Sequence, residues 1–84
     1  MQQREDALER SRDANGVERC TYCDQPLDRR AGSPNSAEID HKKAYVHGGE
    51  TVDENLDAAC RTCNRSKGSK ELGTEWIPPN ERGD

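Results

Sequence analysis

Residues 38–68 read EIDHKKAYVHGGETVDENLDAACRTCNRSKG and hold most of the chemically distinctive side chains of this 84-residue chain. A carboxylate and an imidazole, Asp40 and His41, stand next to each other. A carboxamide, Asn55, follows 14 residues after the histidine, and a second one, Asn64, stands directly after a cysteine pair. Because carboxylates and carboxamides bind hard cations and an imidazole accepts protons near neutral pH, this segment is a candidate catalytic site.

The cysteines occur in two pairs, Cys20-x-x-Cys23 and Cys60-x-x-Cys63. Four thiolates suit the tetrahedral coordination of Zn2+, so the pairs predict a structural zinc site. The 36 residues between the pairs, 24–59, exceed the spacing of about 15–20 in common zinc ribbons, which predicts a structural insert. Disulfides and free thiols are the alternatives, but the βαβ context of redox-active CxxC motifs is missing.

The composition explains why such a site is needed. Only 29% of the residues are hydrophobic, 36% are charged, and phenylalanine is absent. Apolar burial on this scale does not offset the entropy of ordering a chain, whereas zinc binding contributes folding free energy directly. We expect one domain over 1–84, with a motif core at 17–70, a helical lead-in at 1–16 and disorder at 80–84. No apolar run reaches the length of a membrane span, and the N-terminus has no apolar signal region.

Short apolar runs, turn residues and helix formers locate the secondary structure. The predicted elements are strands at 37–41 and 56–60, one helical turn within 52–56 and a helix over 61–70. We expect this helix to end near Gly68 or Gly73 and Trp76 to pack against it. Another helix is predicted over 2–14, mostly solvated and packing lightly because its apolar face is poor.

The net charge of −4 hides a local excess of positive charge. Residues 29–70 carry 8 basic and 6 acidic side chains, and the only charged side chains of residues 61–70 are basic. A basic strip on an acidic protein is typical of nucleic-acid contact. The candidate nucleic-acid-binding residues are Arg61, Arg65, Lys67 and Lys70.

The string EIDH-x5-HGG-x5-NLDAACRTCNRSKG closely resembles the HNH endonucleases, the zinc-stapled branch of the ββα-metal nucleases. The lead-in RDANGVERCTYC is similar as well, so the resemblance covers about residues 12–70. It implies a small α+β fold, in which a helix crosses a two-stranded antiparallel hairpin with a long loop between its strands. A zinc ion held by all four cysteines would tie the first cysteine pair to the start of that helix, and an N-terminal helix would precede the motif.

The resemblance also implies roles for single residues. Asp40 and Asn64 resemble the ligands of a catalytic divalent ion, His41 resembles the general base, and Asn55 resembles the asparagine that pins the loop and orients the histidine. This would be an H-N-N variant, and its oxygen ligands suit Mg2+ or Mn2+. The alternatives are a packing role for His41, a plain loop role for Asn55 and a helix N-cap role for Asn64.

The resulting hypothesis is a metal-dependent endonuclease that hydrolyses DNA phosphodiester bonds. One alternative is a zinc-stapled nucleic-acid-binding module without catalysis, and another is a nuclease toxin domain of a larger secreted bacterial protein. The expected partner is DNA, with no membrane and with an immunity protein or phage or restriction machinery as a possible protein partner. We expect a cytoplasmic location, which for a toxin domain would be the cytoplasm of the target cell. The sequence leaves open the oligomeric state, the choice between DNA and RNA, and whether one or both strands are cut.

Overall fold

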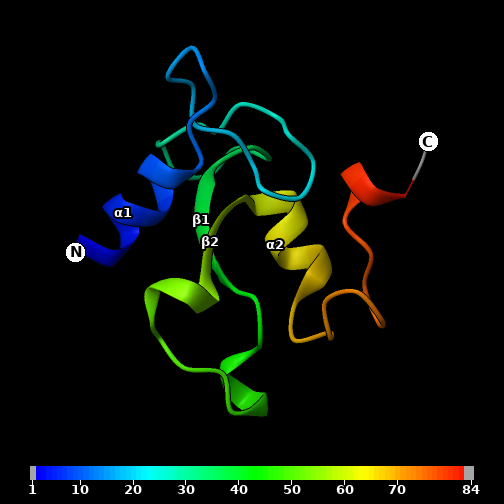
Figure 1. Ribbon diagram of the computed structural model, residues 1–84. Coiled ribbons are helices and arrows are strands. Elements are labelled where there is room, and N and C mark those ends of the chain that lie inside the picture. The colour runs from blue at the N-terminus through cyan, green and yellow to red at the C-terminus, as the bar shows by residue number, and fades with distance from the viewer. Residues whose placement is uncertain (1, 83–84) are drawn as a thin grey trace.

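Two antiparallel strands stand at the centre of the structure, with a helix on either side (Figure 1). The computed structural model describes residues 2–82. The elements in chain order are α1 (Gln2–Arg10), β1 (Ala37–His41), the short 3-10 turns η1 (Tyr45–His47) and η2 (Asp53–Asn55), β2 (Leu56–Cys60), α2 (Arg61–Lys67) and η3 (Pro79–Glu81). This is the predicted small α+β fold, and the strands and the helical turn before β2 lie where the sequence predicts them.

The register of the hairpin fixes where each motif residue lies along it. Ala37 pairs with Cys60 at one end and His41 pairs with Leu56 at the other. β2 is almost entirely buried because α1 packs against one side of the hairpin and α2 against the other. Since Cys60 ends β2 and also caps the N-terminus of α2, the strand and the helix are joined without a loop.

The helix α2 ends at Lys67, directly before a glycine with a positive φ angle. Gly68 adopts a φ of +54° and its N–H donates to the carbonyl of Asn64, which closes the last turn. The predicted end near Gly68 is therefore confirmed. Of the two alternatives in the sequence, Gly73 lies outside the helix.

The N-terminal helix differs from the prediction in length and in packing. α1 ends at Arg10 rather than near residue 14, because the Ser11 hydroxyl bonds the carbonyl of Leu8 and the Asp13 carboxylate accepts the backbone N–H groups of Asn15 and Val17. Light packing is wrong too: Leu8 is fully buried in a cluster with Ala37 and Ala58. The buried Ala7 and Leu8 thus anchor a helix whose other residues are polar.

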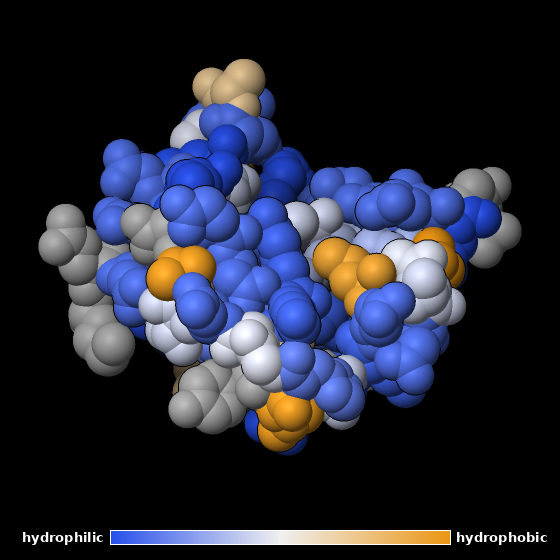
Figure 2. Space-filling model, turned by 60° about the horizontal axis from the view of Figure 1, so that its bottom comes forward, coloured by the Kyte–Doolittle hydropathy of each residue, from blue (hydrophilic) through white to orange (hydrophobic). Residues whose placement is uncertain are grey.

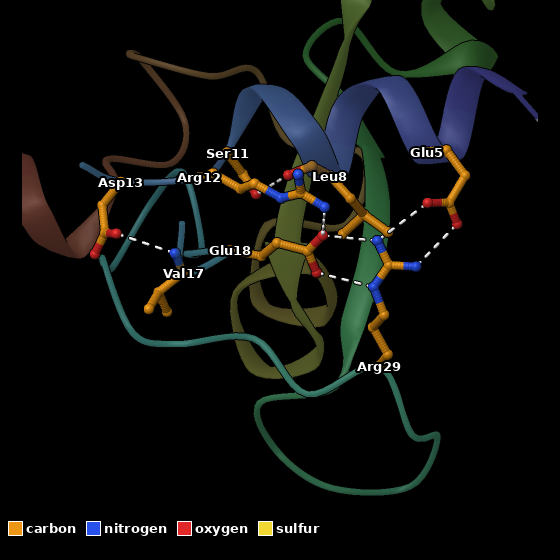
Figure 3. A network of polar contacts seen from close by, with 8 residues as sticks. All are labelled: Glu5, Leu8, Ser11, Arg12, Asp13, Val17, Glu18 and Arg29. Atoms are coloured by element: carbon orange, nitrogen blue, oxygen red, sulfur yellow. Dashed lines mark hydrogen bonds and ion pairs between the residues drawn. The ribbon is translucent and has the colours of Figure 1, made fainter. Parts of the chain in front are cut away.

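Charge pairing holds α1 over this apolar contact (Figure 3). The guanidinium of Arg29 forms a two-bond fork with Glu5 of α1, at 2.9 and 3.1 Å, and a second fork with Glu18, at 3.0 and 2.6 Å. Glu18 also lies 3.6 Å from Arg12. Bidentate pairs of this kind are stronger than single surface ion pairs, so three separate segments are fastened together here.

The C-terminal segment packs back onto the first cysteine pair. Trp76 is buried, donates from Nε1 to the Ser66 hydroxyl at 3.0 Å and meets the Tyr22 ring edge-on at 5.2 Å. The predicted packing of Trp76 against the helix is confirmed. Asn80 then bonds the carbonyls of Thr21 and Tyr22 at 2.9 Å, and residues 79–81 form η3. The expected disorder at 80–84 stays a prediction. Residues 83–84 lie outside the described residues.

The core is small and is partly made of thiols, as the composition predicts. Its larger cluster consists of Cys20, Tyr22, Ala59, Cys60, Cys63 and Trp76. No helix within residues 2–82 is long and apolar enough to cross a membrane. Figure 2 turns the loop between β1 and β2 toward the viewer, and this face is mostly hydrophilic with apolar side chains in separate spots. A polar face of this kind is not typical of a large hydrophobic protein interface.

Candidate active site and metal centre

The four cysteines converge on one point between the start of α2 and the first cysteine pair. Their sulfur atoms all lie within 4.8 Å of one another, and the Sγ atoms of Cys23 and Cys60 are 3.7 Å apart. A zinc tetrahedron with bonds of about 2.3 Å has sulfur–sulfur edges of about 3.8 Å, so the spacing fits this ion. All four are free thiols, which argues against the disulfide alternative. The cysteines are thus clustered for zinc binding.

Backbone N–H groups support the thiolates. The N–H of Tyr22 points at the Sγ of Cys20 at 3.4 Å, and the N–H of Cys63 points at the Sγ of Cys60 at 3.3 Å. Burial raises the pKa of Cys23 to about 11 and raises that of Cys63 as well. Burial also opposes ionisation of Cys60, but hydrogen bonds from the Cys63 N–H and the neighbouring thiols outweigh it and lower its pKa. Thiols that resist joint ionisation need a cation to become four thiolates.

Asp40 is buried, with 3% of its surface exposed, and both of its carboxylate oxygens have neighbours. The Tyr22 hydroxyl donates to Oδ2 at 2.5 Å, and the Lys67 Nζ lies 3.4 Å from Oδ1. Burial raises the pKa of Asp40, and the Tyr22 and Lys67 contacts only partly offset this. Burial and the carboxylate acceptor raise the pKa of Tyr22 far above its usual value, so the phenol stays a donor.

Lys67 corrects one prediction. The sequence predicts nucleic-acid contact for it, but its side chain is completely buried and its Nζ donates to the carbonyl of His41 at 2.9 Å. The reason is helical spacing: Cys63 and Lys67 are four residues apart and share the face of α2 that meets the sheet. Its ammonium therefore compensates Asp40 instead of binding phosphate.

His41 ends β1 and is only partly buried. Its Nε2 lies 3.1 Å from the hydroxyl of Thr51, in the loop between the strands. Thr51 is absent from the predicted site residues, because a hydroxyl ten residues from the histidine carries no local signal. The contact holds the imidazole against the loop from one side.

Asn55 closes the loop that follows His41. Its Oδ1 accepts the N–H of Lys43 at 2.8 Å, and its Nδ2 donates to the carbonyls of Lys43 and Glu50 at 3.0 and 2.8 Å. The chain passes so closely here that a Cβ on Gly49 would collide with the Lys43 carbonyl, so only glycine fits. The geometry matches the loop-pinning role that the family resemblance implies for Asn55.

Asn64 lies on α2 opposite β1. Its Nδ2 donates to Glu38 at 2.7 Å, which leaves Oδ1 as the atom that can meet a cation. The N-cap of α2 is Cys60, so the capping alternative for Asn64 is excluded. Glu38 also lies 3.9 Å from the exposed side chain of Arg65.

Three of the predicted site residues meet in one place. Asp40, His41 and Asn64 line an open pocket of about 190 Å³. Its remaining lining residues are Ile39, Ala44, Val46, Gly68 and Ser69. One carboxylate and one amide oxygen beside an imidazole, in a pocket that water can enter, fit a hard divalent cation.

A second, larger pocket of about 690 Å³ adjoins the first, because Ala44 and Ser69 line both. Lys42, Lys43 and Lys70 are among its lining residues, and so is Asn55. Lys70 is exposed, with its Nζ on the carbonyl of Ser66. Arg61 and Arg65 of α2 line neither pocket.

The fold and this pocket together define a small ββα nuclease-type domain with a four-cysteine metal site. A family model described as HNH endonuclease matches residues 20–70, and the chain belongs to that family. Membership implies nuclease-family function and a nucleic-acid substrate. Comparison with curated proteins and with solved structures gave no match.

Proposed function

We propose that this protein is a metal-dependent endonuclease that hydrolyses DNA phosphodiester bonds at the pocket of Asp40, His41 and Asn64. The observation that carries the proposal is the meeting of these three side chains in one open pocket, within the segment that matches the family. Hydrolysis of a phosphodiester needs a proton acceptor for water and positive charge for the phosphate. His41 fits the first need, and Asp40 and Asn64 fit the second as residues that would hold a divalent cation.

His41 is the proposed general base. A neutral imidazole has one N–H and one basic nitrogen, and the hydrogen bond at one nitrogen selects the tautomer. When Nε2 carries the proton and donates it to Thr51, the basic lone pair is on Nδ1. In its proposed role the imidazole takes the proton of an attacking water molecule.

Asp40 and Asn64 are the proposed ligands of Mg2+ or Mn2+. The Oδ2 of Asp40 is held by Tyr22, while the 3.4 Å contact of Oδ1 with Lys67 is longer than the usual distance of about 2.7–2.9 Å for a charge-assisted bond. Oδ1 of Asp40 and Oδ1 of Asn64 are therefore the candidate donor atoms. When bound, such an ion supplies Lewis-acid stabilisation of the developing negative charge on phosphate.

The substrate strand is proposed to run from the first pocket into the second, past Lys42, Lys43 and Lys70. These ammonium groups can neutralise the phosphates beside the scissile bond. Arg61 and Arg65, outside both pockets, would contact phosphates farther away. The cysteine cluster is proposed to hold a structural zinc ion, which keeps α2 and its Asn64 against β1.

A binding module without catalysis is the second candidate, and one observation favours it. Both oxygens of Asp40 already have protein neighbours, as in an aspartate with a purely structural role. The test is zinc-loaded protein with supercoiled plasmid in Mg2+, in Mn2+ and without a divalent ion. The proposal expects nicked or linear DNA with Mg2+ or Mn2+ only. DNA that shifts in a gel but is not cut with either ion would favour the binding module.

A further inference from the structure

Tyr22 links the cysteine cluster to the candidate active site. It lies between two zinc-binding candidates in the chain, Cys20 and Cys23, yet its hydroxyl donates to Asp40 at 2.5 Å. Both partners of this hydrogen bond are buried. A single side chain therefore joins the cysteine cluster to the candidate active site.

Three contacts hold Tyr22 in place, two through its backbone and one through its ring. Its N–H points at the Sγ of Cys20, and its carbonyl accepts the N–H of Asn80 at 2.9 Å. Its ring meets Trp76 edge-on, at 5.2 Å between centroids and 85° between planes. Trp76 is itself fixed by its hydrogen bond to Ser66. The hydroxyl thus reaches Asp40 from a support made of the first cysteine pair and the C-terminal segment.

This support decides how the carboxylate of Asp40 can rotate. With Oδ2 bonded to Tyr22, the carboxylate plane is fixed and Oδ1 is the oxygen that remains for a cation. The ammonium of Lys67 lies 3.4 Å from Oδ1, and it is anchored on the carbonyl of His41. A partner that orients a ligating carboxylate commonly affects metal affinity as much as a weak ligand does.

We propose that Tyr22 is a positioning residue for the catalytic divalent ion, through which the cysteine cluster fixes the orientation of Asp40. The inference rests on the proposed function, since it takes Asp40 as a metal ligand. It adds that the two metal sites are coupled: a disordered first cysteine pair releases Tyr22, and Asp40 then loses its fixed orientation even though it is not a zinc ligand.

The test is direct binding of Mn2+ to zinc-loaded protein, measured from the electron paramagnetic resonance signal of free Mn2+. Tyr22→Phe should keep one zinc per chain and bind Mn2+ about 10–100-fold more weakly than wild type. Plasmid cleavage by this variant should approach the wild-type rate at saturating Mn2+, because the ion restores the orientation that the hydroxyl supplied. A general loss of folded protein would lower the maximal rate instead.

Ser11→Ala is the matched control, since it also removes one hydrogen-bonded hydroxyl, but that hydroxyl bonds the carbonyl of Leu8 and contacts neither Asp40 nor the residues that support Tyr22. Its Mn2+ affinity should stay close to that of wild type. Unchanged Mn2+ affinity in zinc-loaded Tyr22→Phe would overturn the inference. If Tyr22→Phe loses its zinc, Trp76→Phe replaces it: this variant keeps the hydroxyl but loosens its support, and unchanged Mn2+ affinity there would equally overturn the inference.

Asp40→Asn separates this inference from the proposed function. Wild type that binds no Mn2+, or Asp40→Asn that binds it as tightly as wild type, would refute the proposed metal site itself. Binding that depends on Asp40 but not on Tyr22 would refute only the positioning role.

Discussion

The side-chain amide of Asn55 pairs with the backbone of Lys43 on both sides, accepting its N–H at 2.8 Å and donating to its carbonyl at 3.0 Å. The same Nδ2 also reaches the carbonyl of Glu50. The Asn55 side chain therefore makes hydrogen bonds to the backbone like those between paired strands, and these bonds close the loop of residues 42–54. Because this loop starts directly after His41 and carries Thr51, we expect its shape to set the orientation of the imidazole.

Replacement of Asn55 by alanine should leave the zinc site intact and reduce cleavage about 100-fold, since small misplacement of a catalytic group has effects of that order. Single-turnover cleavage and amide hydrogen exchange over residues 42–54 measure the two effects. Asn35→Ala is the matched control, because that exposed amide makes one hydrogen bond, to Pro26, far along the chain from the loop. Wild-type cleavage by Asn55→Ala would refute the pinning role.

Replacement of Cys60 by serine should abolish stoichiometric zinc binding and cooperative unfolding. Cys60 is a ligand candidate, the last residue of β2 and the N-cap of α2, and the free energy of structural zinc binding, about 10–16 kcal/mol, exceeds the stability of a domain this small. Zinc analysis and thermal unfolding by circular dichroism check this. Thr62→Ser, within the same cysteine pair, is the control. A Cys60→Ser protein with unchanged thermal stability would contradict the zinc-dependent fold.

The two lysines that the sequence treats alike, Lys67 and Lys70, should behave differently. Lys67→Met leaves the buried Asp40 without its counter-charge and should cost about 3 kcal/mol of unfolding free energy. Lys70→Ala, at an exposed position, should change stability by less than about 0.5 kcal/mol and reduce the salt dependence of DNA binding by about one phosphate contact. Urea unfolding and DNA binding across a salt series measure both. Equal losses of unfolding free energy in Lys67→Met and Lys70→Ala would contradict the structural role of Lys67 as the counter-charge of Asp40.

Glu18→Gln should cost about 1 kcal/mol of stability, because it breaks a bidentate pair with Arg29 and leaves the guanidinium paired with Glu5 alone. The hydrogen bonds from Arg29 lower the pKa of Glu18 below its usual 4.5. The contribution is therefore complete above pH 4.5 and is lost as the pH falls below that value. Acid also protonates the thiolates that would bind zinc, so a pH series would change two interactions at once. Added salt screens the Glu18–Arg29 ion pair and therefore tests this contact more selectively. The difference between wild type and Glu18→Gln in urea unfolding should shrink at about 1 M NaCl, and a salt-independent difference would argue for a packing effect.

Local patterns predicted the two strands and α2, because strand length and helix start are properties of neighbouring residues. The pairing of the strands into a hairpin and the shared site of Asp40, His41 and Asn64 were implied by the family resemblance instead. The missed features depend on distant partners. Leu8 packs tightly because Arg29, 24 residues beyond Glu5, holds the helix in place. The burial of Lys67 was missed because lysine is rarely buried without a partner, and that partner, Asp40, lies across the sheet. The contact of Tyr22 with Asp40 was missed for the same reason, because the two residues are 18 positions apart in the chain.

The central claim, that His41 is the base of a metal-dependent nuclease, is tested most directly by plasmid cleavage with wild type, His41→Ala and His47→Ala at matched zinc content. His47 is exposed and lies outside the pocket of Asp40, His41 and Asn64, although it lines the larger second pocket, so its variant controls for the loss of an imidazole beside the DNA but away from the proposed metal site. The account predicts cleavage with Mg2+ or Mn2+ by wild type, a loss of about 100–10,000-fold in His41→Ala and a change of no more than a few-fold in His47→Ala. Cleavage by His41→Ala at the wild-type rate would contradict it.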